Sequence, residues 1–107
     1  MICRMWRGWT SRDNASAYER VVRGEVIPGI ESRRIPGFQQ IDLLRYDDGG
    51  EVLFVTLMWF DELASIRRFT GEDYTVSHVP DAARAVLSRF DERATHFTVL
   101  DRRAQGG

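Results

Sequence analysis

The sequence contains no lysine, a single cysteine and only two histidines, and each scarcity excludes a class of function. All fifteen cationic residues are arginine, and they are scattered along the chain rather than gathered in one basic block. Nucleic-acid-binding proteins concentrate positive charge on one face. With a formal net charge of −1, we therefore expect no nucleic-acid partner.

The cysteine and histidine content leaves little room for a metal centre. One cysteine, Cys3, excludes an internal disulfide and any cysteine-rich metal site, and it suits a reducing compartment. Two histidines alone rarely hold a metal, and the sequence has neither the Ser-His-Asp spacing of hydrolases nor a glycine-rich phosphate loop. We expect no metal cofactor.

Long hydrophobic runs are also missing. The longest apolar run, residues 52–60, is interrupted by Thr56 and is too short to span a bilayer as a helix. The apolar stretch at the N-terminus contains Arg4 and Arg7, which a signal peptide would not tolerate there. The composition thus predicts a cytoplasmic protein without a membrane segment.

The chain is long enough for one domain with one core. It has 107 residues, of which 43% are hydrophobic and 29% charged, as is usual for globular proteins. We expect a single domain over residues 1–101 and a polar, frayed tail over residues 102–107.

Hydrophobic periodicity predicts the order β-α-β-β-α-α-β. Strands are expected at residues 2–9, 38–46, 51–60 and 94–100, and helices at residues 14–26, 61–70 and 80–90. Pro28-Gly29 should loosen or end the first helix, with room for a last irregular turn before Pro36-Gly37. Asp61 should cap the second helix, and Asp47-Asp48-Gly49-Gly50 predicts a hairpin turn. This order indicates an α+β fold of the ferredoxin-like type, a four-stranded antiparallel sheet with its helices on one face.

The strand over residues 51–60 is apolar on both faces. Its alternate residues form two hydrophobic sets, Leu53, Val55, Leu57 and Trp59 on one side and Val52, Phe54, Met58 and Phe60 on the other. Helices of the same chain can cover only one face, and the other would expose more apolar area than soluble monomers usually do. The C-terminal tail is too polar to cover it. We therefore predict a homodimer, with the sheets of two subunits stacked into a barrel.

Several short stretches carry a family resemblance. They are Trp6-Arg7-Gly8-Trp9-Thr10, Tyr18-Glu19, Ile35-Pro36-Gly37-Phe38, the end of the third strand from Leu57 to Asp61, Gly71-Glu72-Asp73 ahead of Pro80, and His96-Phe97-Thr98-Val99. In this order, over nearly the whole chain, they resemble the antibiotic-biosynthesis-monooxygenase group of the dimeric α+β-barrel superfamily. That superfamily includes cofactor-independent oxygenases of phenolic polyketides, haem-degrading enzymes and proteins of no known activity, so the fold alone does not choose the chemistry.

A barrel of two sheets would enclose a largely apolar cavity suited to a small molecule. His96, on the strand face opposite Phe97 and Val99, is the candidate general base, unless it only hydrogen-bonds the partner chain. Arg7 is the candidate anion stabiliser, and Asp42 could pair with it or lie exposed at the sheet edge. The side chains expected to line the cavity are Trp9, Gln40, Asp42, Trp59 and His78.

These observations leave three functional hypotheses. The first is an oxygenase of an aromatic or phenolic small molecule without metal or flavin, in which the substrate carbanion reacts with O2. The second is a homodimer that binds a small apolar ligand or is purely structural. The third is a haem-binding protein, because His78 is placed after Trp59 much as the haem-ligating histidine is in haem-degrading relatives. Against the third, the first strand has no asparagine, and Arg68 replaces the tryptophan of those enzymes.

Overall fold

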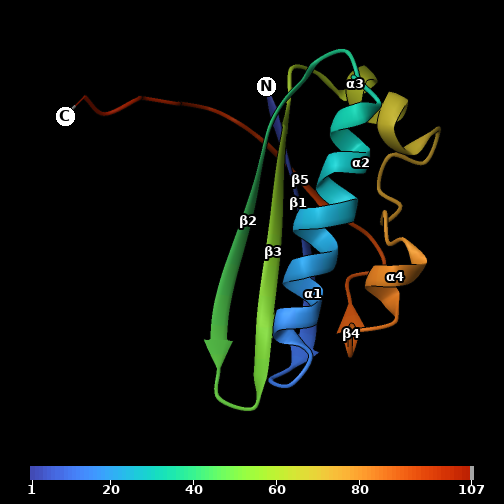
Figure 1. The fold of residues 1–107 in the computed structure, drawn as a ribbon. Helices are drawn as coiled ribbons and strands as arrows, with labels where there is room; N and C mark the ends of the chain where they lie inside the picture. Colours follow the sequence, from blue (N-terminus) through green and yellow to red (C-terminus); the bar gives the residue numbers. More distant parts are fainter. Residues whose placement is uncertain (107) are drawn as a thin grey trace.

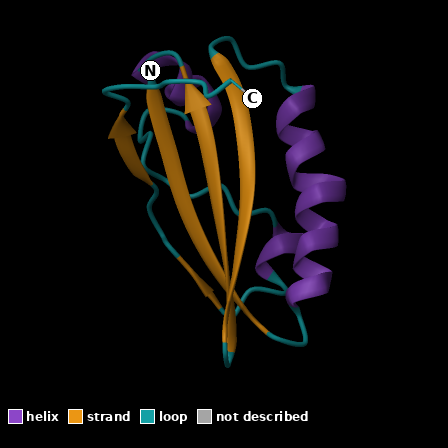
Figure 2. Cartoon of the chain, turned by 90° about the vertical axis from the view of Figure 1, so that its left-hand side faces the viewer, coloured by secondary structure: helices purple, strands orange, loops and turns teal. Residues whose placement is uncertain are grey.

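One antiparallel sheet with helices on a single face forms the protein (Figures 1 and 2). The computed structural model describes residues 1–106. Its strands are β1 (Ile2–Ser11), β2 (Phe38–Asp48), β3 (Glu51–Phe60), β4 (Arg89–Phe90) and β5 (Thr95–Thr98). They follow the order β2-β3-β1-β4, and β5 pairs with the first half of β1. The predicted ferredoxin-like arrangement is confirmed, and Gly49-Gly50 makes the predicted turn between β2 and β3.

The first helical region is longer than the sequence predicted. It runs as α1 (Ala15–Val21), the π-helical turn η1 (Val22–Val26) and α2 (Ile27–Ser32), so it continues past the predicted end near Val26, and Pro28 loosens the helix rather than ending it. Pro28 has no N–H to donate to the carbonyl of Gly24, which would break an ordinary α-helix. The wider π-turn absorbs this loss, because the Ile27 N–H bonds the carbonyl of Val22. Pro28 then sits in the first turn of α2, where a missing N–H costs little.

The second half of the chain is less helical than predicted. Helix α3 (Leu63–Thr70) ends as expected at Gly71, whose φ of 96° favours glycine, but Asp61 lies one residue before the N-cap. Helix α4 covers only Asp81–Arg84, so the predicted helix to residue 90 was wrong. There the chain forms β4 instead, because its backbone pairs with the free edge of β1 at Gly8 and Trp9.

The two faces of the sheet differ in what covers them. On the helix face the alternate residues of β3 are buried, and Phe54 and Phe60 have no exposed surface. On the other face, here called the open face, the side chains between them are only half-buried. Tyr46 of β2 is 61% exposed there and Phe97 of β5 is 48% exposed. The hydrophobic core therefore lies entirely between the sheet and the helices.

The C-terminal tail touches the open face at one point. It runs past the strands in extended form (Figure 1), and the guanidinium of Arg102 stacks on the Trp59 ring at 4.8 Å from its centroid. Arg102 also donates a 3.4 Å hydrogen bond to Gln40. A cationic side chain can cover an aromatic face in this way, so the tail is attached at Arg102 rather than frayed from its first residue.

Thr10 offers a test of the core. Its side chain is fully buried on β1, and within residues 1–106 its Oγ1 is the only buried side-chain polar atom without a hydrogen-bond partner. Thr10→Val replaces the hydroxyl with a methyl of similar size, so we expect the free energy of unfolding to rise by about 1 kcal/mol. Urea denaturation measures this, with Thr10→Ser, which keeps the hydroxyl, as the control. A drop in stability for Thr10→Val would mean that the hydroxyl has a partner.

Candidate functional site

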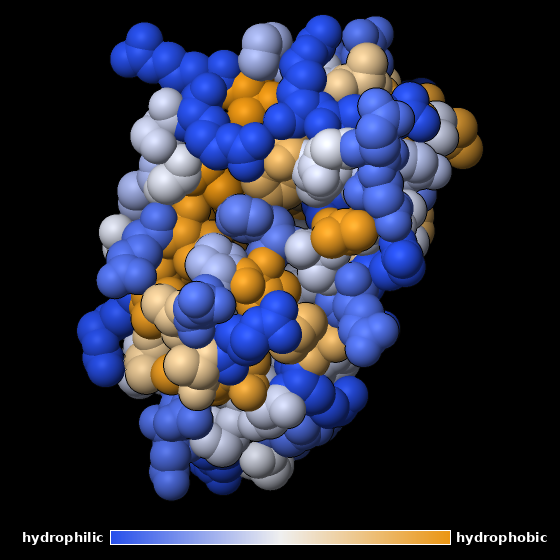
Figure 3. All heavy atoms as spheres, turned by 90° about the vertical axis from the view of Figure 1, so that its right-hand side faces the viewer, coloured by the Kyte–Doolittle hydropathy of each residue, from blue (hydrophilic) through white to orange (hydrophobic). Residues whose placement is uncertain are grey.

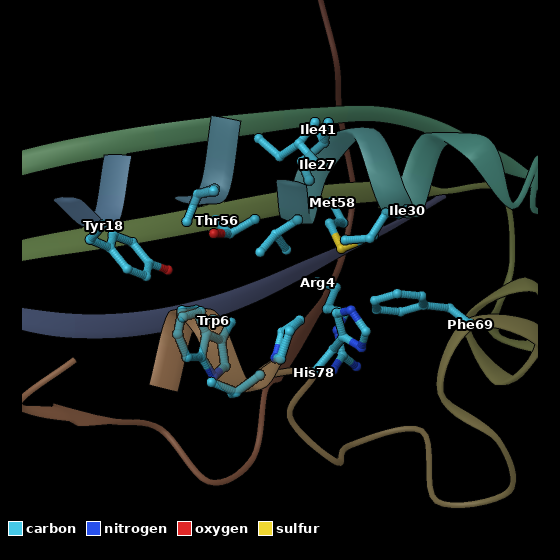
Figure 4. Close-up of a pocket in the computed structure, with 15 residues that line it drawn as sticks. Arg4, Trp6, Tyr18, Ile27, Ile30, Ile41, Thr56, Met58, Phe69 and His78 are labelled. Atoms are coloured by element: carbon cyan, nitrogen blue, oxygen red, sulfur yellow. The ribbon is translucent and has the colours of Figure 1, made fainter. Parts of the chain in front are cut away.

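A cavity lies between the helix face of the sheet and the helices, within a single chain (Figure 4). Its walls are Arg4 and Trp6 of β1, Ile41, Thr56 and Met58 of β2 and β3, Tyr18, Val22, Val26, Ile27 and Ile30 of the first helical region, and Phe69, His78, Val79, Pro80 and Ala83. The sequence analysis had placed the cavity between the sheets of two subunits. The cavity that the structure describes lies on the other side of the sheet.

Strand alternation and helical spacing bring these side chains together. Arg4 and Trp6 lie two residues apart on β1 and therefore share a face, opposite Met58 and Thr56 of β3. From the helices, Tyr18 points into the same space. The walls are largely apolar, with few polar atoms, as in sites for small organic ligands. The volume of the cavity that the centre of a water-sized sphere can reach is about 40 Å³.

Arg4 is the charged group of this cavity. It is 2% exposed, and its Nη1 donates to the carbonyl of Tyr74 while Nη2 donates to the carbonyl of Val76 at 2.6 Å. No carboxylate of residues 1–106 forms an ion pair with it. Burial lowers the pKa of Arg4 to about 10, so the guanidinium is still a cation at neutral pH.

His96 lies beside Arg4 rather than free in the cavity. The two residues face each other across β5 and β1, and Nη1 of Arg4 is 3.1 Å from Nε2 of His96. Because a guanidinium can only donate, Nε2 must accept, and the neutral ring then carries its proton on Nδ1. Burial and the charge of Arg4 lower the pKa of His96 to about 4. His96 is thus neutral, and its accepting nitrogen is already used to hold Arg4.

His78 is the second imidazole, and it lines the cavity where the cavity meets solvent. The centroid of its ring is 5.0 Å from that of Phe69, and no hydrogen bond joins it to a described residue. Burial, followed by the charges of Arg33 and Arg4, lowers the pKa of His78. At neutral pH it therefore offers an unprotonated nitrogen with no protein partner.

Two hydroxyl groups complete the polar lining. Tyr18 is 2% exposed and Thr56 is half-buried. Neither hydroxyl hydrogen-bonds a described residue, and unlike Thr10 Oγ1 neither oxygen is fully enclosed by protein atoms. Burial raises the pKa of Tyr18, so its hydroxyl keeps its proton and can donate it in a hydrogen bond. Figure 4 shows Tyr18 toward one end of the cavity and Arg4, His78 and Phe69 toward the other.

The other residues singled out from the sequence lie on the open face and do not line this cavity. Arg7 is exposed and bonds Asp91 at 2.8 Å. Asp42 accepts 2.8 Å hydrogen bonds from Gln40 and Trp59, which lower its pKa, so the suggested pair between Asp42 and Arg7 does not form. The guanidinium of Arg7 stacks on Trp9 on the same face. Alternation is the reason, because odd-numbered residues of β1 point away from the helices.

Sequence reasoning missed Arg4, Tyr18 and Thr56. Arg4 and Thr56 do carry a signal, since each is a polar residue whose two neighbours on the same strand face are apolar. Residues 1–106 also lack two further features, a cluster of metal ligands and a membrane-spanning helix. No group of three or more His, Cys, Asp or Glu residues could hold a metal ion, and no helix is long and apolar enough to cross a membrane.

The low pKa of His96 predicts how stability depends on pH. In the folded protein His96 resists protonation until about pH 4, whereas an unfolded histidine takes up its proton near pH 6.5. Folding is therefore weakened as pH falls from 6.5 towards 4, and because water screens this partly exposed ring the loss at pH 4.5 is about 1 kcal/mol. Urea denaturation at pH 7 and pH 4.5 should show a smaller loss for His96→Gln than for the wild type. Equal losses would show that His96 titrates normally.

Several solved structures of other proteins share this fold. No family model and no curated protein matches the chain, but solved structures do. An antibiotic-biosynthesis-monooxygenase-type protein from Nitrosomonas europaea has a TM-score of 0.67 and 15% identity, over 94% of this chain and 100% of that one. SnoaB, a cofactor-independent oxygenase from Streptomyces nogalater, has a TM-score of 0.62 and 21% identity, over 94% and 95%.

A third relative was solved with a ligand. The monooxygenase from the gene ActVA-Orf6 of Streptomyces coelicolor, in complex with nanaomycin D, has a TM-score of 0.64 and 16% identity, over 98% of this chain and 92% of that one. Identities this low carry the fold and not the activity. The chain has the fold of the antibiotic biosynthesis monooxygenases, as the resemblance in its sequence predicted.

Proposed function

We propose that this chain binds a small aromatic or phenolic molecule in its cavity and oxidises it with O2, with no flavin, haem or metal of its own. The observation that carries the proposal is the cavity itself. Its walls are apolar, while Arg4, His78, Tyr18 and Thr56 bring to it polar groups that the protein leaves partly or wholly unpaired. Such groups orient a ligand in an otherwise apolar site. SnoaB, which shares the fold, is a cofactor-independent oxygenase.

His78 is the general base in this proposal. It is neutral at neutral pH and has a nitrogen free to accept a proton from a phenol or from an activated ring CH2. The resulting carbanion reacts with O2, so that CH2 and O2 give C=O and H2O. The substrate supplies all four electrons, one oxygen atom enters the product and the other leaves as water. His96, the base suggested by the sequence, instead holds Arg4 in position.

The size of the cavity limits the ligand. A space of about 40 Å³ for the centre of a water-sized sphere is well below the roughly 150 Å³ of an apolar cavity that binds benzene. Binding of an aromatic substrate therefore requires movement of the segment over residues 71–80, which carries His78 and contains no helix. Hydrophobic atoms reach the surface among polar ones on that side of the molecule (Figure 3). The residues present do not fit a haem macrocycle in so small a space, so we do not propose haem binding.

The open face supports a proposed homodimer. Half-buried Leu53, Val55 and Leu57 form its centre, with exposed Leu44 and Tyr46 beside them on β2. Soluble proteins usually cover a continuous apolar surface of this kind, and a second copy stacked sheet on sheet would do so. A cytoplasmic location, which the unpaired Cys3 suits, completes the proposal.

Oxygen uptake tests the reaction. With anthrone and with single-ring phenols as substrates, His78→Ala should lower kcat at least about 100-fold, the usual effect of losing a general base. His96→Gln should mainly raise KM, because it disturbs the position of Arg4. Unchanged turnover in His78→Ala would place the base elsewhere. Ligand binding without any oxygen uptake by the wild type would favour the non-catalytic alternative.

Analytical ultracentrifugation tests the pairing of subunits. The wild type should sediment at twice the mass of the chain, and Leu57→Asp should sediment as a monomer, because it places a charge in the middle of the proposed interface. Ala64→Asp is the matched control, since Ala64 is exposed on α3, away from the open face. A monomeric wild type at micromolar concentration would contradict the homodimer.

A further inference from the structure

We infer that the ligand of this cavity is a small aromatic monocarboxylate, and that its carboxylate binds Arg4. This inference rests on the proposed function, because it names the class of molecule that the proposed site takes.

The ion pairs of the arginines lie at the surface, where they add least to stability. Five of them, Arg7, Arg45, Arg89, Arg93 and Arg103, form ion pairs with Asp or Glu at exposed positions. Water screens such surface pairs, which contribute little to stability. Arg4 is almost fully buried and has no acidic partner among residues 1–106, although an uncompensated buried charge is expensive. A ligand that carries the missing negative charge would remove this penalty.

The guanidinium of Arg4 also has unused donors. It has five N–H groups, and the protein engages three of them, through Tyr74, Val76 and His96. The N–H of Nε and one N–H of Nη2 are left, and these two nitrogens flank one edge of the planar group. A carboxylate can bridge such an edge with both oxygens. The three engaged donors explain how Arg4 holds residues 74–76 in place. The edge between Nε and Nη2 has no part in that structural role.

A second arginine strengthens the positive field at this end of the cavity. The ring of Phe69 lies 5.4 Å from the guanidinium of Arg4 and 5.3 Å from that of Arg33. Arg33 donates to the carbonyls of Arg68 and Phe69, and it forms no ion pair within the described chain. An anion beside Phe69 is therefore attracted by two cations, whereas an uncharged group of the same shape is not.

Once the cavity widens, its remaining walls have the apolar character that the body of an aromatic acid requires. Trp6, Met58 and Ile30 provide apolar walls next to Arg4, which exclude water and so strengthen the charge–charge interaction. The hydroxyls of Tyr18 and Thr56 lie farther along the cavity (Figure 4). They could hydrogen-bond a hydroxyl on the ring, so a hydroxylated aromatic acid would satisfy both ends of the site.

Benzoate and benzamide make the decisive comparison, because they have nearly the same shape and differ in charge. Each is titrated into the 15N-labelled protein while the three tryptophan indole signals are followed by NMR. Trp6 lines the cavity, whereas Trp9 and Trp59 lie on the open face and serve as internal controls. We expect benzoate to shift the Trp6 signal with a Kd about 10- to 100-fold lower than that of benzamide, the effect of hydrogen bonds to a charged group.

Variants then assign the preference to Arg4. Arg4→Met should abolish the preference for benzoate while benzamide still binds, and Arg33→Met should reduce it in part. Arg84→Met is the matched control, because Arg84 also stacks on an aromatic ring, that of Phe90, but does not line the cavity. If Arg4→Met fails to fold, the wild-type comparison and Arg33→Met still decide the matter.

Each other outcome overturns the inference in a distinct way. Equal affinity for the two ligands at Trp6 would exclude carboxylate recognition but leave the proposed function standing, since a neutral aromatic would occupy the cavity. Shifts confined to Trp9 or Trp59 would place binding on the open face. If neither ligand shifts any tryptophan signal and oxygen uptake is absent, both the inference and the proposed function fail.

Discussion

The hydrogen bonds of the Arg4 guanidinium connect the parts of this protein that make the site. They join the central strand β1 to the segment over residues 74–76 and to His96 of β5. That segment is otherwise held mainly by a single bridge between Val76 and Arg93 and by a few loop hydrogen bonds. One buried cation therefore shapes the wall of the cavity and at the same time sets its charge.

The two faces of the sheet are suited to different tasks, and strand alternation separates them. Even-numbered residues of β1, such as Arg4 and Trp6, point toward the helices and line the cavity. Odd-numbered residues, such as Arg7 and Trp9, point to the open face, where a second subunit is proposed to bind. A shift of one residue in the register of β1 would exchange the two sets, so the long pairing of β1 with β3 keeps each set on its own face.

The π-helical turn contributes to the same site. Because Pro28 could not continue an ordinary α-helix, the wider turn at Val22–Val26 lets the helical region go on to Ser32. This extension carries Ile27 and Ile30 over the sheet, where they line the cavity. Single π-turns inside helices are often found at functional sites, and here the turn sets the length of one wall.

The sequence by itself determined four of the five strands, the turn at Gly49-Gly50 and the hydrophobic character of both faces of β3, because these depend on local pattern. It also contained the signal for Arg4 and Thr56, two polar residues that share the helix face of the sheet. Only the tertiary structure decided which face the helices cover, and with it that Arg4 rather than Arg7 enters the cavity. It also turned the end of the predicted last helix into β4, through pairing with a strand some eighty residues earlier. Contacts such as that between Arg4 and Tyr74, which are distant in sequence, leave no trace in local periodicity and arise only when the chain packs.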